Sequence, residues 1–217
     1  MDTVVFVDST VIKQFSSKTV LVKINAEVDT LAKQKYGVMG YPTVVVADAS
    51  GKEFDRIIGY LPPADFLQTV SDYQAGKGTL DAMLGQAKSD KSPMLAKEIA
   101  DKYKYRGDDK SAEKWYQQVL ASVKPNDTLA AMIRIDMADM YRRMNAYDKA
   151  LAAFMAIEKD FSGTAYAADA AVYIGIVQAR KGDTTAALST YNRYLTSYPN
   201  GSDTDYVRTQ IEKLKKK

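Results

Sequence analysis

The 217-residue chain lacks both cysteine and histidine, and each absence excludes a class of chemistry. Without cysteine the chain can form no disulfide bond, thiolate nucleophile or thiolate-ligated metal site. Without histidine it has no imidazole base, no Ser-His-Asp triad and no histidine-ligated zinc. Catalysis would have to rest on carboxylates, Lys, Arg, Tyr, Ser or Thr. No pattern of these residues indicates a catalytic site, a metal site or a cofactor.

A strong excess of one charge and long hydrophobic runs are also lacking. Thirty basic and twenty-seven acidic side chains leave a formal charge of +3, which is too even for a typical nucleic-acid-binding protein. The longest apolar stretches, such as residues 4–7 and 44–47, are far shorter than the roughly 20 residues of a membrane-spanning helix. We therefore expect no nucleic-acid partner and no membrane insertion. The compartment is left open, and a periplasmic or secreted location would require a leader upstream of Met1.

The sequence changes character near residue 76. Upstream of this point, short β-branched runs alternate with helical patterns, whereas no strand pattern is found from residue 79 onward. Apolar residues make up 46% of the chain, as in ordinary globular proteins. We expect an α/β domain at residues 1–76, a connecting helix or linker at 77–91 and an all-α region at 92–217.

The α/β region contains a regular series of predicted elements. β-Branched composition indicates strands, turn residues at 49–52 indicate an antiparallel hairpin, and Pro62-Pro63 begins a helix. The predicted order is a strand at 19–25, a helix at 27–36, strands at 42–48 and 53–58, and a helix that ends before the glycines at 76–78.

This order, together with Tyr36-Gly37-Val38-x-Gly40-Tyr41-Pro42-Thr43, resembles the C-terminal two-thirds of a thioredoxin-like domain. The resemblance covers residues 20–70, and Gly59 matches a family glycine after the hairpin. It implies a cis peptide bond before Pro42. It also implies that Tyr41, Pro42 and Thr43 lie where the family offers backbone groups to an extended substrate.

The chain departs from this family at its N-terminus. Thioredoxin-like domains place a strand and a C-x-x-C motif before the elements found here, and residues 1–12 resemble the segment that follows those cysteines. Two explanations stay open. The chain begins late and its cysteines lie upstream of Met1, or it is a degenerate, redox-silent relative.

The missing strand would lie between the strands at 20–25 and 43–47, so its absence leaves two edges unpaired. Three outcomes are open. The two strands close up on each other, a second copy donates a strand to form a homodimer, or residues 3–7 fill the gap.

A repeat runs through the all-α region. Its three units are Gly107-x4-Ala112-x3-Tyr116, Asn145-x4-Ala150-x3-Phe154 and Gly182-x4-Ala187-x3-Tyr191, and their alanines lie 38 and 37 residues apart. The pattern resembles the tetratricopeptide repeat, although its period exceeds the usual length of about 34 residues. The resemblance implies three helical hairpins, with residues 202–215 as a polar capping helix. The fold class is therefore α/β plus all-α: a partial thioredoxin-like sheet domain followed by a tetratricopeptide-repeat array.

In tetratricopeptide repeats the first helix of each unit lines a concave face. Counted from the alanines, that face brings four cations together: Lys104, Arg142, Arg143 and Arg180. One interpretation is a groove for an extended peptide with acidic groups or a C-terminal carboxylate. The other is a solvated face whose charges keep the array in solution.

We expect a protein–protein interaction module that binds protein or peptide clients and carries a redox-silent thioredoxin-like domain. The alternative is a thiol–disulfide oxidoreductase whose C-x-x-C site lies upstream of Met1, so the sequence leaves enzymatic activity undecided. A third interpretation is a periplasmic or secreted assembly factor, because repeats that end in Tyr-Pro-Asn-Gly resemble those of bacterial envelope proteins.

Overall fold

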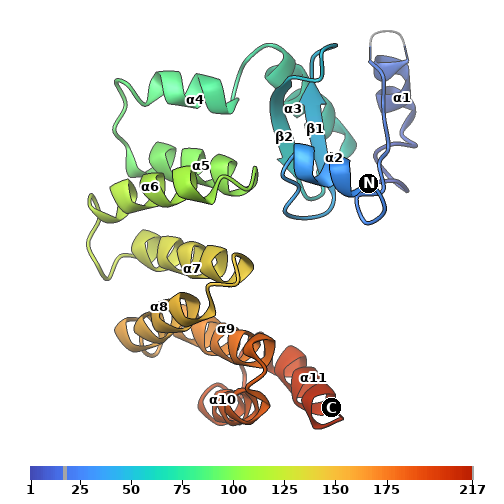
Figure 1. Cartoon of the computed structure of the whole chain (residues 1–217). Coiled ribbons are helices and arrows are strands. Elements are labelled where there is room, and N and C mark those ends of the chain that lie inside the picture. The colour runs from blue at the N-terminus through green and yellow to red at the C-terminus, as the bar shows by residue number, and fades with distance from the viewer. Residues whose placement is uncertain (17–18, 217) are drawn as a thin grey trace. The chain divides into compact units, whose positions relative to one another are not determined.

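The computed structural model describes residues 1–16 and 19–216 (Figure 1). The chain divides into two compact units, Met1–Trp115 and Tyr116–Lys217. The boundaries at residues 76 and 91, which were predicted from changes in sequence composition, both lie inside the first unit. Among the described residues, no helix is both long and apolar enough to cross a membrane.

The first unit is built on an antiparallel hairpin of β1 (Thr43–Ala47) and β2 (Glu53–Ile58), in which Thr43 lies opposite Ile58. This hairpin was predicted from the turn residues between the strands and is confirmed. α3 (Pro63–Gln74) packs on both strands, and α1 (Ser9–Phe15) packs on α3. The short α2 (Thr30–Lys35) precedes β1.

Phe66 of α3 is the centre of this small core. It is buried with Val5, Val11, Val46, Ile57 and Val70, and Phe6 and Phe15 meet its ring edge to face. Such arrangements add about 0.5–1.5 kcal/mol to area burial. The apolar residues of the N-terminal segment therefore cover the helix rather than extend the sheet.

The predicted strand at residues 19–25 is wrong. This segment has no strand pairing in the structure, and its apolar side chains are exposed. A strand needs a hydrogen-bonded neighbour, and among the described residues β1 pairs only with β2. The two segments therefore do not close up on each other. Residues 3–7 do not fill the gap either, because they form turns that bury Val5.

Three helices complete the first unit and lead into the second: α4 (Leu80–Gln86), α5 (Pro93–Lys104) and α6 (Asp109–Leu120). The side chains of Thr79 and Ser92 cap α4 and α5 by accepting backbone N–H groups. Ala87, Leu95 and Ile99 form a core with Trp115 packed against it.

The second unit is helical. It contains α7 (Thr128–Arg143), α8 (Tyr147–Asp160), α9 (Ala165–Lys181), α10 (Thr184–Ser197) and the terminal α11 (Thr204–Lys215), with successive helices packed on each other. The predicted anchors Ala112, Ala150 and Ala187 are fully buried. The expected helical array is confirmed.

The repeat pattern has a clear structural cause. Gly107, Asn145 and Gly182 each have a positive φ, of 74°, 58° and 90°, in the turn between paired helices. Glycine and asparagine adopt this conformation most readily, which explains why each unit begins with one of them. Gly175 supports the close approach of α9 and α10, because a Cβ there would lie 2.3 Å from the Tyr191 ring.

Candidate functional site

We call residues 37–43 of the first unit, which include Pro42, the proline loop. The Tyr41–Pro42 peptide bond is cis, and both side chains are exposed, Tyr41 by 58%. The Pro42 carbonyl accepts a hydrogen bond from Gly59 N–H at 2.9 Å, and Thr43 Oγ1 donates to the Gly40 carbonyl at 2.7 Å. The structure thus brings the predicted Tyr41, Pro42 and Thr43 together at the start of β1.

Sequence reasoning missed a second aromatic side chain at this end of the hairpin. Tyr60 directly follows Gly59, the residue bonded to Pro42, and its side chain is 53% exposed. The strand register Thr43–Ile58 was the available signal, because its continuation sets Tyr60 at the same end as Tyr41. Two exposed tyrosines give this loop an amphipathic surface.

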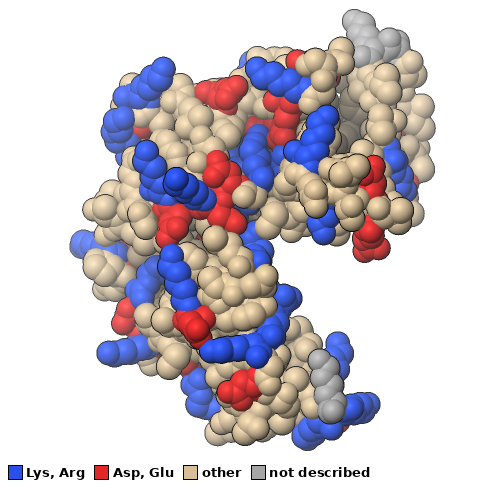
Figure 2. All heavy atoms as spheres, in the orientation of Figure 1, with Lys and Arg blue, Asp and Glu red and all other residues tan. Residues whose placement is uncertain are grey.

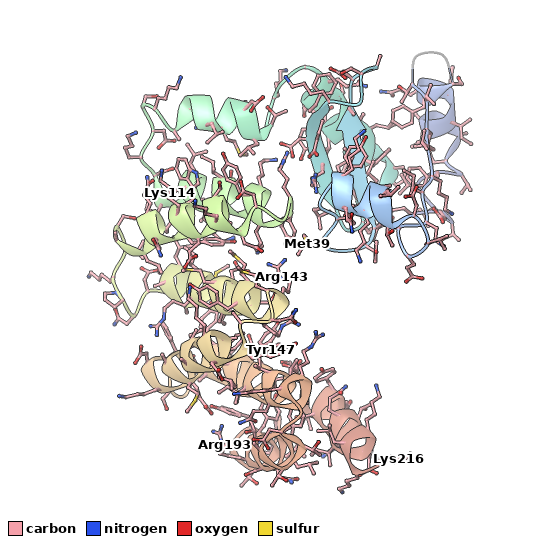
Figure 3. The ribbon with its side chains drawn as sticks, in the orientation of Figure 1. Met39, Lys114, Arg143, Tyr147, Arg193 and Lys216 are labelled. Atoms are coloured by element: carbon pink, nitrogen blue, oxygen red, sulfur yellow. The ribbon has the colours of Figure 1, made fainter. Side chains whose placement is uncertain are left out.

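The proline loop lies against the turn between α5 and α6. Gly37 has φ 53°, and a Cβ on it would lie 2.1 Å from the Arg106 carbonyl oxygen. A Cβ on Gly107 would meet Met39 Sδ at 3.5 Å, and Figure 3 labels Met39 on this loop. Because these backbones approach so closely, the position of the proline loop depends on the first helical hairpin.

A buried charge cluster joins the same elements, and sequence reasoning missed it entirely. Asp55 on β2 is fully buried. Its Oδ2 accepts hydrogen bonds from Leu80 N at 2.7 Å and Lys102 Nζ at 2.9 Å. Its Oδ1 accepts one from Arg56 N at 2.7 Å and pairs with Arg106 Nη2 at 2.9 Å. One carboxylate therefore ties β2 to the start of α4 and to the end of α5.

Glu53 and Arg56 extend the cluster. Arg56 pairs with Glu53 at 2.5 Å and donates to the Tyr105 carbonyl at 2.9 Å, while Arg106 pairs with Glu53 at 3.1 Å. A cleft of about 280 Å³ borders these side chains. Since these cations and carboxylates are already paired with one another, we assign the cluster to stability rather than to ligand binding.

The cluster shifts two pKa values. Burial opposes ionisation of Asp55, but Lys102, the Arg56 N–H and Arg106 outweigh it, so the pKa of Asp55 lies below its usual range. Burial, reinforced by the charge of Asp55, raises the pKa of Tyr73 to about 12. The tyrosine hydroxyl is therefore neutral, and the carboxylate charged, throughout the physiological range.

Lys104 lies in the first unit and is largely buried. Its ammonium pairs with Asp101 at 3.3 Å and lies 4.9 Å from the centre of the Tyr105 ring. Asp101 also pairs with Lys97 at 2.6 Å. The structure thus places this predicted groove cation in a local ion network, while the other three predicted cations belong to the second unit.

Arg142 and Arg143 occupy the last turn of α7 and share one carboxylate (Figure 3 labels Arg143). Arg142 donates to Asp139 Oδ1 through Nε at 2.7 Å, and Arg143 Nε lies 3.2 Å from Asp139 Oδ2. Their side chains are only 15% and 18% exposed. Asp139 therefore holds the Arg142 guanidinium through a hydrogen bond and neutralises part of the charge of both arginines.

Arg180, in the last turn of α9, differs from this pair. Its side chain is exposed, and within residues 1–16 and 19–216 no carboxylate forms an ion pair with it. Tyr206, near the start of α11, is 41% exposed. Burial raises the pKa of Tyr206, while the charges of Arg180 and Arg142 act in the opposite direction.

We call Arg142, Arg180 and Tyr206 the inner-helix face, because they come from α7, α9 and α11 of the second unit. The sequence predicted the two arginines as site residues but not Tyr206. The candidate face was counted from the repeat alanines, and Tyr206 lies in the capping helix, outside the three repeats. Acidic and basic side chains are interspersed over the visible surface rather than gathered by sign (Figure 2). The face is therefore amphipathic and locally cationic within a mixed surface.

The side chains of this face are suited to hydrogen bonding and to packing. Guanidinium groups donate to carboxylates, and tyrosine rings pack on apolar side chains while their hydroxyls stay hydrated. Within the described part of the chain, no three His, Cys, Asp or Glu residues lie together as a metal site would require.

Comparisons with known proteins agree with both halves of this description. A family model described as a thioredoxin-like domain matches residues 3–74, which include the proline loop, the hairpin and α3. A model described as a tetratricopeptide repeat matches residues 169–201, which include Gly182, Ala187 and Tyr191. A search of curated proteins finds no match to the chain. The chain thus carries a thioredoxin-like domain followed by a tetratricopeptide repeat.

Proposed function

We propose that the chain is a protein-binding module and that its inner-helix face holds an extended peptide bearing an acidic group. The observation that carries this proposal is that α7, α9 and α11 of one unit each contribute a cation or an exposed tyrosine, Arg142, Arg180 and Tyr206, and that both cations act electrostatically on the Tyr206 hydroxyl. Helices of this kind present side chains along one face of a repeat array, where extended peptides dock.

The two arginines have different parts in this proposal. Arg142 is held by Asp139, so little side-chain entropy is lost when it donates to a client carboxylate. Arg180 is exposed and carries no intramolecular ion pair among the described residues, so its guanidinium is available to a client. Tyr206 supplies apolar contact area beside both charges.

The thioredoxin-like domain offers a second contact for clients in the first unit. Tyr41 and Tyr60 are exposed beside Pro42, where an extended segment finds aromatic surface and backbone groups. Disulfide exchange proceeds through a mixed disulfide with a protein thiolate, and this chain contains no cysteine. We therefore propose peptide binding as the role of these residues.

Charge reversal on the inner-helix face tests the proposal. The probe is a fluorescently labelled octapeptide of Glu, Asp and Leu with a free C-terminal carboxylate, and its binding is measured by fluorescence anisotropy. We expect Arg180→Glu to weaken binding by about tenfold or more, since hydrogen bonds to charged groups contribute about 1.5–3 kcal/mol.

The matched control is Arg208→Glu. Arg208 lies on α11 two residues beyond Tyr206, is 67% exposed, and its reversal changes the net charge by the same amount. Binding within twofold of wild type is expected for this control. Equal weakening by both variants would mean that the peptide senses only net charge, and unchanged binding by Arg180→Glu would refute the proposed site.

A further inference from the structure

Residues 20–24 form an exposed apolar segment with an unsatisfied backbone. Val20, Leu21, Val22 and Ile24 are 87%, 54%, 69% and 45% exposed. Among the described residues, none forms a backbone hydrogen bond with any residue of this segment. Contiguous exposed apolar side chains mark interaction surfaces, and free N–H and C=O groups add the capacity to pair as a strand.

β1 offers the complementary element. It pairs with β2 on one side only, as far as the described residues show, so its other edge presents N–H and C=O groups with which a further strand can pair. β1 has five residues, Thr43–Ala47, the same number as the exposed segment. None of the five is charged, so Lys23, the one charged residue of the segment, would meet no like charge opposite.

We propose that two copies of the chain pair reciprocally, with residues 20–24 of each copy adding as a strand to the free edge of β1 in the other. A second copy is the occupant to which the observations point, because donor and acceptor are present on every chain in equal number and equal length. The pairing is self-complementary, so a two-fold symmetric dimer satisfies both edges at once. This inference does not depend on the proposed client binding.

A nearby hollow gives independent support. An apolar recess of about 270 Å³ lies between α1 and the start of the segment and is lined by Phe6, Val11, Ile12, Phe15, Ser16, Thr19 and Leu21. Apolar surface of this kind favours side chains removed from water. Strand addition beside Leu21 would bring apolar side chains of the partner copy to this recess.

Cysteine cross-linking of the full chain tests the pairing, and the absence of natural cysteines leaves no background. Val22 and Val45 are the central residues of the two segments, so they lie opposite each other whether the strands run parallel or antiparallel. Directly opposed residues have Cβ atoms about 4.5–5.5 Å apart, close to the range of a disulfide. A Val22→Cys chain and a Val45→Cys chain of different mass are mixed and mildly oxidised.

We expect the mixed pair to form covalent heterodimers about tenfold faster than Val22→Cys mixed with Met155→Cys, an exposed control position on α8. Sedimentation of the wild-type chain should show a dimer that dissociates on dilution. Leu21→Pro and Val22→Pro remove successive N–H groups that bond to no described residue of the same copy, so at least one of them should abolish the dimer while leaving Trp115 fluorescence unchanged.

Three results would overturn the proposal. They are a chain that stays monomeric at all concentrations, cross-linking no faster than with the control position, or a dimer that survives both proline variants.

Discussion

The two compact units differ in which charged and apolar side chains they bury and which they leave exposed. The second unit buries small and aromatic anchors such as Ala150, Phe154 and Ala187, and leaves ion pairs such as Lys181–Asp148 in solvent. The first unit has an apolar core around Phe66, but it also buries Asp55 and Arg56 and leaves the apolar side chains of residues 20–24 exposed. Apolar burial provides most of the stability of a fold, whereas a buried charge is tolerated only when it is paired.

The difference follows from how each unit satisfies its backbone. Helices form their hydrogen bonds within each element, so each hairpin of the array needs only its neighbours to be complete. A strand depends on partners elsewhere in the chain or on another chain. The first unit is held together by a few long-range contacts, and its stability should therefore depend on single residues.

The largest expected effect is the loss of the Asp55 charge. Asp55→Asn should lower the free energy of unfolding of the first unit by about 3–5 kcal/mol, because Lys102 and Arg106 would be left partly buried without their counter-ion. Urea denaturation followed by Trp115 fluorescence measures this, since Trp115 packs in the first unit.

The matched control in the second unit is Asp148→Asn, which removes an ion pair whose carboxylate is 86% exposed. It should change stability by less than about 0.5 kcal/mol. Comparable losses for the two variants would contradict the contrast between buried and exposed pairs.

The same cluster predicts a pH dependence. The pKa of Asp55 is lower in the folded chain than its unfolded value of about 3.9, so its contribution is complete above that pH. This stabilisation is lost as the pH falls below the pKa of Asp55 in the unfolded chain and then through its lower pKa in the folded chain. The stability gap between wild type and Asp55→Asn should thus be constant from about pH 7 to 5 and shrink below about pH 4. A gap that persists undiminished at pH 3 would show that the charge of Asp55 is not its source.

A smaller effect is expected from overpacking in the array. Ala187 is fully buried between paired helices, so Ala187→Leu should destabilise the second unit by about 1–3 kcal/mol, measured by thermal denaturation followed by far-ultraviolet circular dichroism. Ala152 on α8 is exposed and should accept leucine with little change. Equal responses would mean that the repeat register is wrong.

The array could be predicted from sequence because its determinants are local. Gly107, Asn145 and Gly182 mark the turns, and each buried alanine follows five residues later, so one alignment places all three hairpins. The β1–β2 hairpin was predictable for the same reason, since its turn residues lie between its strands.

The first unit was predicted less well because its determinants are long-range. The residues 20–24 have strand composition, but composition does not show whether a partner strand is present. Asp55 and Lys102 are 47 residues apart, and no sequence spacing indicates their contact. The structure shows Phe54 exposed and Asp55 buried, so a carboxylate occupies the inward position of a strand that contains apolar residues, which strand composition alone did not indicate.

Amide hydrogen exchange of the full chain, at a dilution at which sedimentation shows it to be monomeric, tests the contrast between the two units most directly. Residues 20–24 should exchange nearly as fast as an unfolded peptide, while the interior amides of α7, α8, α9 and α10 stay protected. At higher concentration protection should appear in residues 20–24 and rise in β1. If residues 20–24 are already protected in the dilute monomer as strongly as the array helices, the segment has a partner within its own chain and the account is contradicted.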